Sequence, residues 1–233
     1  RVLFRSAVGL YDIVGDKVVR RKRAELDVAG AVTAVPELAG EKVVDLVVLN
    51  DGDLSYGKLR FDDRSIATLK SHLGKIEDPL TRALAWSASW DMTRDGELAA
   101  SDYVPMVLNA LAYENDVAVV ATQMLQLGTA VELYASDKNR DALRTILADG
   151  IEKLLDGAAA GSDMQLQYVR SFAASAKSPA QVSKVRDILD GKVSGVTVDA
   201  NLRWTLLNSL VERGAATVAE VEAELANDKS ADG

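Results

Sequence analysis

The spacing of apolar residues changes near residue 62, and this change constrains the fold of the chain more than any other feature of its sequence. After it, apolar residues recur three and four positions apart, as on the buried face of an amphipathic helix. Asp62-Asp63 gives the first segment an acidic start, and Asp78-Pro79 combines a capping aspartate with a proline in the first turn of the second. Ser101 is expected to cap a third helix that reaches Glu114. Further helices are predicted at 116–135, 137–158, 163–176, 179–190, 200–213 and 217–227.

These segments amount to about nine helices with short links, and short links favour antiparallel packing of neighbouring helices. The predicted fold class is therefore mainly α. Residues 62–233 are expected to form an irregular α-helical repeat domain, HEAT- or armadillo-like and superhelical. The sequence contains no repeat of fixed period, so any solenoid is expected to be irregular.

Before residue 62 the chain consists of short extended runs separated by turn residues. Ala7–Val14 and Lys17–Val28 flank Gly15-Asp16, a two-residue spacing typical of a β-hairpin. Further strands are predicted at 31–35, at 43–49 and, with imperfect alternation, at 54–61. So few strands cannot close a sandwich by themselves. Residues 7–61 are therefore predicted to be a small antiparallel remnant of a β-sandwich.

The first six residues, RVLFRS, resemble the translated end of a short-read sequencing adapter. Residues 1–6 are accordingly expected to be an assembly scar and are left out of the fold prediction. The predicted organisation is thus a scar at 1–6, a β-sandwich remnant at 7–61 and a helical domain at 62–233.

The charge pattern makes nucleic acid a poor partner, since the net charge is −8 and phosphate binding needs a concentrated basic face. The most basic segment, Arg20–Arg23, alternates across both faces of a strand and is interpreted as a solvated edge. No stretch has the roughly 18 to 20 uninterrupted apolar residues of a membrane span, and the start does not resemble a secretory signal. No nucleic-acid or membrane partner is predicted.

The chain contains a single histidine, His72, and no cysteine. One imidazole cannot supply the two or three that catalytic zinc sites usually need, and without cysteine there is no thiolate nucleophile or sulfur ligand. His72 falls near the end of a predicted helix, where a surface or capping role is favoured. We therefore predict no catalytic residue and no metal ligand. A chain without disulfides fits a cytoplasmic location.

The run Asp51-Gly52-Asp53-Leu54-Ser55 resembles the start of a calcium-binding loop. Such a loop needs glycine at its sixth position, where this chain has Tyr56, and it lies between helices rather than predicted strands. A turn between two strands is the preferred interpretation.

Two arginines are candidates for contacting a ligand. Arg82, Trp86, Trp90 and Arg94 recur every four residues and form one stripe on a helix, which suits either a carboxylate-binding surface or a helix-packing seam. Arg203 lies at the start of an apolar helix, where a buried guanidinium requires a carboxylate partner. At both places structural packing is the favoured interpretation, and ligand contact by Arg82 or Arg203 is the alternative.

Longer stretches carry a family resemblance. The run LVVLNDGDLSYGKLRFDDRS, residues 46–65, resembles the junction between the β-sandwich and the helical C-terminal domain of aminopeptidase N enzymes. The asparagine turn, the tyrosine and the acidic helix start of that junction are matched by Asn50, Tyr56 and Asp62-Asp63. Residues 78–98, 113–120, 161–176 and 199–214 resemble the actinobacterial-type branch of the family, and the resemblance runs collinearly through residues 8–233.

The resemblance implies a zinc metalloaminopeptidase of the gluzincin type, which removes N-terminal residues from peptides. The HExxH helix and GAMEN-type loop of that family do not occur in this chain, so zinc and catalysis are expected in an upstream domain. The helical domain is expected to cap the active-site chamber and to limit substrate access, with Arg82 or Arg203 facing the chamber. The chain alone is expected to be inactive. Residues 228–233 match a loop of the family, so further helices are expected to follow.

Two other interpretations remain open. The first is a free-standing helical-repeat scaffold that binds another protein through a concave surface. The second is an enzyme built only on carboxylates, although no convergent pair can be chosen from the sequence.

Overall fold

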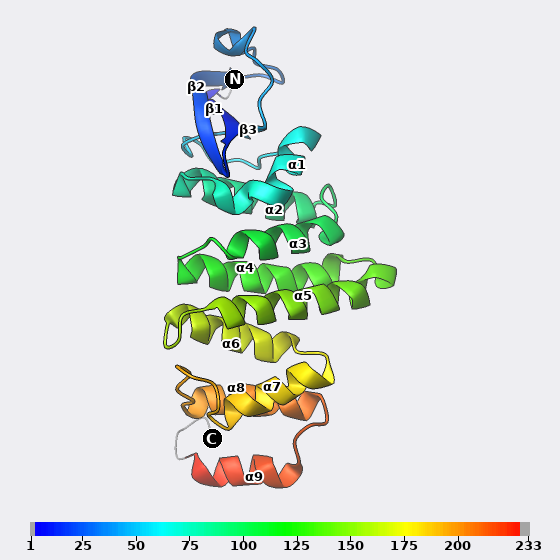
Figure 1. The fold of residues 1–233 in the computed structure, drawn as a ribbon. Coiled ribbons are helices and arrows are strands. Elements are labelled where there is room, and N and C mark those ends of the chain that lie inside the picture. The colour runs from blue at the N-terminus through cyan, green and yellow to red at the C-terminus, as the bar shows by residue number, and fades with distance from the viewer. Residues whose placement is uncertain (1–2, 229–233) are drawn as a thin grey trace. The chain divides into compact units, whose positions relative to one another are not determined.

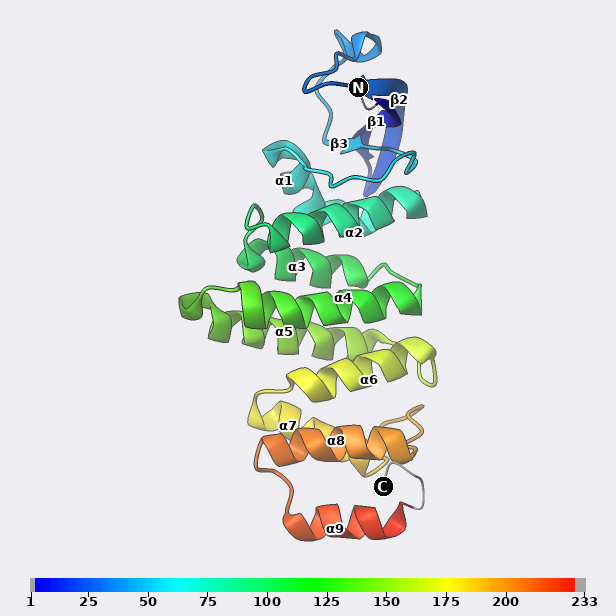
Figure 2. The ribbon, with the colours of Figure 1, turned by 180° about the vertical axis from the view of Figure 1, so that it is seen from behind.

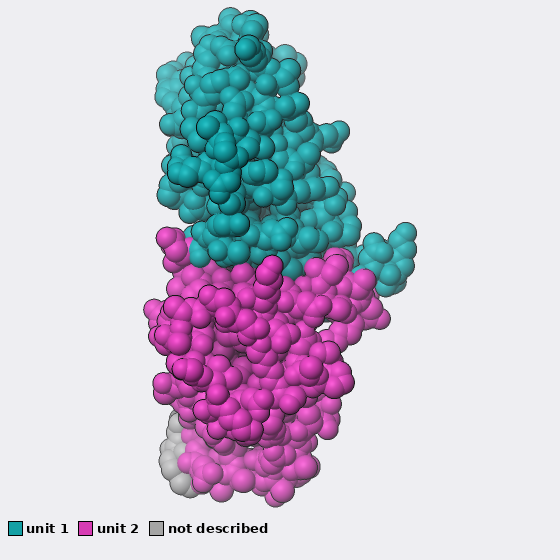
Figure 3. Space-filling model, viewed as in Figure 1, with its two compact units in different colours: residues 1–114, 126–139 teal, residues 115–125, 140–233 magenta. Residues whose placement is uncertain are grey.

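The computed structural model describes residues 3–228, and the chain divides into two compact units (Figure 3). Unit 1 contains the residues up to Glu114 together with 126–139, and unit 2 contains 115–125 and the residues from Arg140 onward. The strands and the first three helices lie in unit 1, and the last four helices lie in unit 2. The predicted boundary between residues 61 and 62 lies inside unit 1, and the proposed division into domains stays a prediction.

The sheet of unit 1 has three antiparallel strands in the order β2-β1-β3 within the described residues (Figures 1 and 2). They are β1 (Leu3–Val14), β2 (Lys17–Ala29) and β3 (Leu46–Leu49). The predicted hairpin is confirmed, and Gly15 in its turn adopts a φ of 66°, which glycine reaches without steric cost. Residues 4–6 extend β1 beside 26–28, and the origin of residues 1–6 stays a prediction.

Three strand predictions need correction. Residues 31–35 and 54–61 form no strand in the described part of the chain, and only Leu46–Leu49 of the run 43–49 pairs, with β1. A strand is stable only when a neighbouring backbone satisfies its amides and carbonyls. Residues 54–61 have no such neighbour among the described residues, so β propensity alone does not make them a strand.

The helical part confirms the mainly α fold class. The helices of the described residues are α1 (Asp63–His72), α2 (Pro79–Arg94), α3 (Ala100–Leu111), α4 (Val117–Thr129), α5 (Asp137–Gly157), α6 (Asp163–Ser175), α7 (Pro179–Leu189), α8 (Ala200–Glu212) and α9 (Val218–Asn227). The side chains of Asp62, Asp78, Ser162 and Ser178 cap their helices as the local pattern indicates. Ser101 does not, because α3 begins at Ala100. The superhelical repeat stays a prediction.

The helix α4 continues into a five-residue π-helical turn, Ala130–Tyr134. The 18 residues from Val117 to Tyr134 have a mean hydropathy of 1.2, so by length and composition alone this segment is able to cross a membrane. This is weak evidence for a span, because core helices of soluble proteins pass the same test. The expectation of no membrane partner stays a prediction.

Each unit has its own apolar core. In unit 1 the sheet and α1–α3 bury large side chains completely, including Tyr11, Leu46, Leu69, Tyr103 and Leu111. In unit 2 the helices α5–α8 bury Leu143, Phe172, Val185, Ile188 and Leu206. Full burial of a side chain of this size contributes roughly 1.5–3 kcal/mol, so packing rather than helix propensity stabilises both units.

Candidate functional site

A buried polar network joins the sheet to α2 in unit 1. Its centre is Asp51, which follows β3 and has no exposed surface. The Tyr11 hydroxyl of β1 donates to Asp51 Oδ1 at 2.7 Å and lies 2.9 Å from the Thr81 hydroxyl in the first turn of α2. Arg20 Nη1 and Arg23 Nε of β2 lie 3.1 and 3.5 Å from Asp51 Oδ2. The carboxylate thus fixes both strands of the hairpin to the start of α2.

Gly9 of β1 packs directly against Asp51. A Cβ on Gly9 would lie 2.6 Å from Asp51 Oδ2 and 2.6 Å from Tyr11 Cε2, so this position of β1 needs glycine. Burial raises the pKa of Tyr11 to about 12, and the Asp51 carboxylate acts in the same direction. Tyr11 therefore stays a neutral hydrogen-bond donor near pH 7.

The interpretation of Arg20–Arg23 as a solvated edge is confirmed in part, because β2 is an edge strand within the described residues and all four side chains are partly exposed. All four basic side chains nevertheless have partners. Arg20 and Arg23 pair with buried Asp51, whereas Arg21 and Lys22 pair near the surface with Asp12 and Glu41. Arg20 and Arg23 reach the same carboxylate although they are three residues apart, because a β-bulge leaves Arg21 without a partner in the register and interrupts the alternation of the strand.

The calcium-like motif forms a turn after β3, as preferred, but the turn does not join two strands, because residues 54–61 form no strand in the described part of the chain. The Asp53 amide donates to the Asn50 carbonyl at 2.8 Å, and the Asn50 side chain bonds the Ser55 backbone. Asn50 and Asp53 adopt φ values of 53° and 54°, a region that asparagine and aspartate tolerate better than most residues. Asn50 and Asp53 thus close the turn, whereas the Asp51 carboxylate belongs to the buried network.

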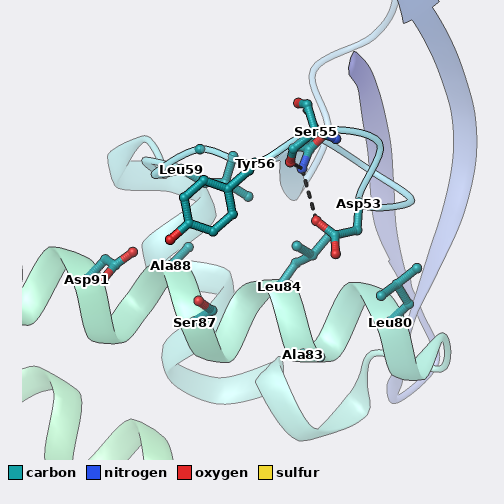
Figure 4. A pocket seen from close by; sticks show the side chains of 12 residues that line it. Asp53, Ser55, Tyr56, Leu59, Leu80, Ala83, Leu84, Ser87, Ala88 and Asp91 are labelled. Carbon is teal, nitrogen blue, oxygen red and sulfur yellow. Dashed lines mark hydrogen bonds between the residues drawn. The ribbon is translucent and has the colours of Figure 1, made fainter. Parts of the chain in front are cut away.

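A groove lies between this loop and α2, and we call it the loop–α2 groove (Figure 4). It has a volume of about 270 Å³. The lining residues are Asn50, Asp53, Ser55, Tyr56, Gly57, Leu59, Leu80, Ala83, Leu84, Ser87, Ala88 and Asp91. The sequence did not single out Asp91. The available signal was the carboxylate of Asp91 in the last turn of a helix, where the helix dipole disfavours negative charge.

The stripe on α2 is mainly a packing seam. Trp86 is buried, and the ring of Trp90 lies 5.6 Å from that of Tyr103 and 5.9 Å from that of Tyr134, centroid to centroid. Arg82 donates through Nε to Glu114 at 3.1 Å and through Nη1 to the Ile76 carbonyl at 2.8 Å. Its side chain is only 15% exposed, so within unit 1 the Arg82 guanidinium is occupied in holding α2.

Arg203 of α8 has a different environment. Its Nε and Nη2 atoms donate to both oxygens of Glu224 in α9 at 2.7–2.9 Å, which confirms the expected carboxylate partner. The Arg203 side chain is 40% exposed and lines a pocket of about 330 Å³ with Arg186, Leu189, Asp190, Leu207, Glu220, Ala223, Glu224 and Asn227. Arg82 and Arg203 lie in different units.

The donor set of the described chain does not fit a zinc ion. His72 ends α1, and its Nδ1 lies 2.8 Å from the Ser71 hydroxyl. No group of three or more His, Cys, Asp or Glu side chains able to hold a metal occurs within residues 3–228. We therefore derive no step through a metal for this chain.

The strands that lead into capped helices define the class as a mainly helical domain preceded by β structure. Residues 46–233 match the family model described as ERAP1-like C-terminal domain, and the chain belongs to this family. It is also 43% identical over 232 residues to Aminopeptidase N of Streptomyces lividans. That alignment covers 98% of this chain and 27% of the relative, so the chain spans about a quarter of the relative's length.

Proposed function

We propose that this chain is a non-catalytic C-terminal region of a zinc-dependent aminopeptidase that removes N-terminal residues from peptides. In this proposal the helices cap the active-site chamber and limit substrate access, while an upstream domain holds zinc. The observation that supports it is the family match along residues 46–233 together with a relative named Aminopeptidase N, of which this chain covers 27%. The single histidine and the absence of cysteine agree with catalysis elsewhere. We propose a cytoplasmic location because the chain has no disulfide.

The purified chain is expected to hydrolyse no aminoacyl anilide, with or without added zinc, because one imidazole cannot complete a catalytic zinc site. The measurement is release of p-nitroaniline from leucine p-nitroanilide, with the Streptomyces lividans aminopeptidase as a positive control. Hydrolysis that zinc restores and a chelator removes would contradict the proposal.

A scaffold protein would be equally inactive, so the upstream reading frame has to be sequenced as well. An HExxH motif there supports the aminopeptidase, and a start codon just before residue 7 supports the scaffold.

Arg203 is the better placed of the two candidate arginines for contacting a long peptide in the chamber. Its Nη1 makes no hydrogen bond within the described residues, and its side chain lines a pocket, whereas Arg82 is nearly buried. A charge-assisted hydrogen bond to a peptide carboxylate contributes about 1.5–3 kcal/mol. In the full-length enzyme, Arg203→Gln combined with Glu224→Gln is therefore expected to raise KM for long peptides about tenfold or more.

The same double variant is expected to leave KM for single-residue anilides unchanged, since these substrates are too short to reach beyond the catalytic residues. Glu224→Gln alone keeps the guanidinium and serves as the matched control, with KM near the wild-type value for both substrate classes. An equal rise in KM for long peptides and for anilides would contradict the assignment of Arg203 to the chamber.

A further inference from the structure

All charged residues that line the loop–α2 groove are acidic. Asp53 and Asp91 contribute two carboxylates, and none of its lining residues is basic. Outside the lining, Arg94 Nη1 lies 3.8 Å from Asp91 Oδ1, and half of the Arg94 side chain is exposed. The two basic residues of the neighbouring loop, Lys58 and Arg60, form ion pairs with Asp95. The lining of the groove therefore carries a net negative charge, although Asp53 Oδ1 also accepts a hydrogen bond from Asn50 Nδ2 at 3.2 Å.

The shape of the groove suits a long, flat cation. Figure 4 shows the ring of Tyr56 over α2, between Asp91 on one side and Asp53 on the other. Tyr56 is fully exposed, so one face of its ring is open to a ligand. Leu80 and Leu84 supply apolar surface along the same helix. A guanidinium on an aliphatic stem combines these contacts, because its plane stacks on an aromatic ring and its N–H groups pair with carboxylates.

We propose that the loop–α2 groove binds the side chain of an arginine residue in a peptide segment. The guanidinium pairs with Asp53 and Asp91 and stacks under Tyr56, and the stem covers Leu84. The Ser87 hydroxyl on the helix is available to accept a hydrogen bond. This site does not depend on the aminopeptidase proposal, because all of its residues belong to unit 1 of this chain.

Asp91 gives a second reason to look for a ligand here. It lies three residues before the end of α2, where the carbonyl end of the helix dipole repels a carboxylate. A bound cation offsets that repulsion. Replacing Asp91 by asparagine is accordingly expected to weaken binding without lowering the thermal midpoint of the chain, a combination that a purely structural role for Asp91 does not predict.

The test is a titration of the isotope-labelled chain with two blocked tripeptides, Nα-acetyl-Gly-Arg-Gly-amide and its citrulline counterpart. Citrulline keeps the size and shape of arginine and removes the charge. The arginine peptide is expected to bind at about millimolar concentration and at least fivefold more tightly than the citrulline peptide. Its effects on amide chemical shifts are expected at Asp53, Tyr56, Ser87 and Asp91.

Three variants complete the design. The pair Asp53→Asn and Asp91→Asn is expected to weaken arginine-peptide binding roughly fivefold to tenfold, since each exposed ion pair makes a small contribution to affinity. Tyr56→Ala, at a fully exposed position, is expected to weaken it about twofold to fivefold. Asp63→Asn, an exposed acidic residue outside the groove, is the control and leaves binding unchanged. Equal binding of both tripeptides, or wild-type affinity in the Asp53/Asp91 double variant, overturns the proposal.

Discussion

Replacing Arg20 and Arg23 together by glutamine is expected to lower the free energy of unfolding of unit 1 by about 3–5 kcal/mol. Both guanidinium groups pair with Asp51, whose side chain has no exposed surface. Removing one half of a buried ion pair leaves the other charge in a medium that solvates it poorly. Tyr11 and Thr81 still bond the carboxylate, but neutral hydroxyls cannot offset its charge.

The measurement follows tryptophan fluorescence during urea unfolding in a Trp204→Phe background. Of the three tryptophans, Trp86 and Trp90 then remain, and both lie on α2 in unit 1. The matched control is Arg21→Gln with Lys22→Gln on the same strand, where the ion pairs are near the surface and the expected loss is below about 1 kcal/mol. Equal losses in the two double variants would contradict the central role of Asp51. Adding Asp51→Asn to the first pair is expected to recover part of the loss.

Replacing Arg203 by methionine is expected to release α9 from unit 2. Glu224 is the buried residue of α9, and its carboxylate is held by three hydrogen bonds from Arg203. Without them a carboxylate that is only 7% exposed loses its charged partner, at a cost of about 3 kcal/mol. A free helix of 10 residues is barely stable in water, so α9 is expected to open locally.

Hydrogen exchange measures this opening residue by residue. The amides of α9 are expected to exchange about 100-fold faster than in the wild type, while those of α5 and α6 keep their protection. The double variant Arg203→Met with Glu224→Leu is expected to recover most of the protection, because leucine at 224 meets Leu189 and Leu207 of the same pocket. As a control, Arg144→Gln removes an exposed pair on α5 and is expected to leave α9 unchanged. Unchanged exchange of α9 in Arg203→Met would show that other contacts hold it.

The difference between helix and strand prediction has a physical origin. Asp62 and Asp78 cap the helices whose starts the sequence places there, because a capping side chain bonds an amide only three residues away. The same locality explains the correct hairpin around Gly15. Residues 54–61 failed as a strand because pairing depends on a partner that local sequence does not reveal.

The same difference between local contacts and contacts of distant segments applies to the polar sites. The sequence alone determined a mainly helical chain, and it predicted a carboxylate partner for Arg203 at the start of an apolar helix, since an unpaired buried charge is too costly. It could not identify Glu224 as the partner, nor bring Asp53, Tyr56 and Asp91 to one groove. These residues meet only when separate elements pack, because contacts between distant segments follow from the whole core rather than from neighbours along the chain.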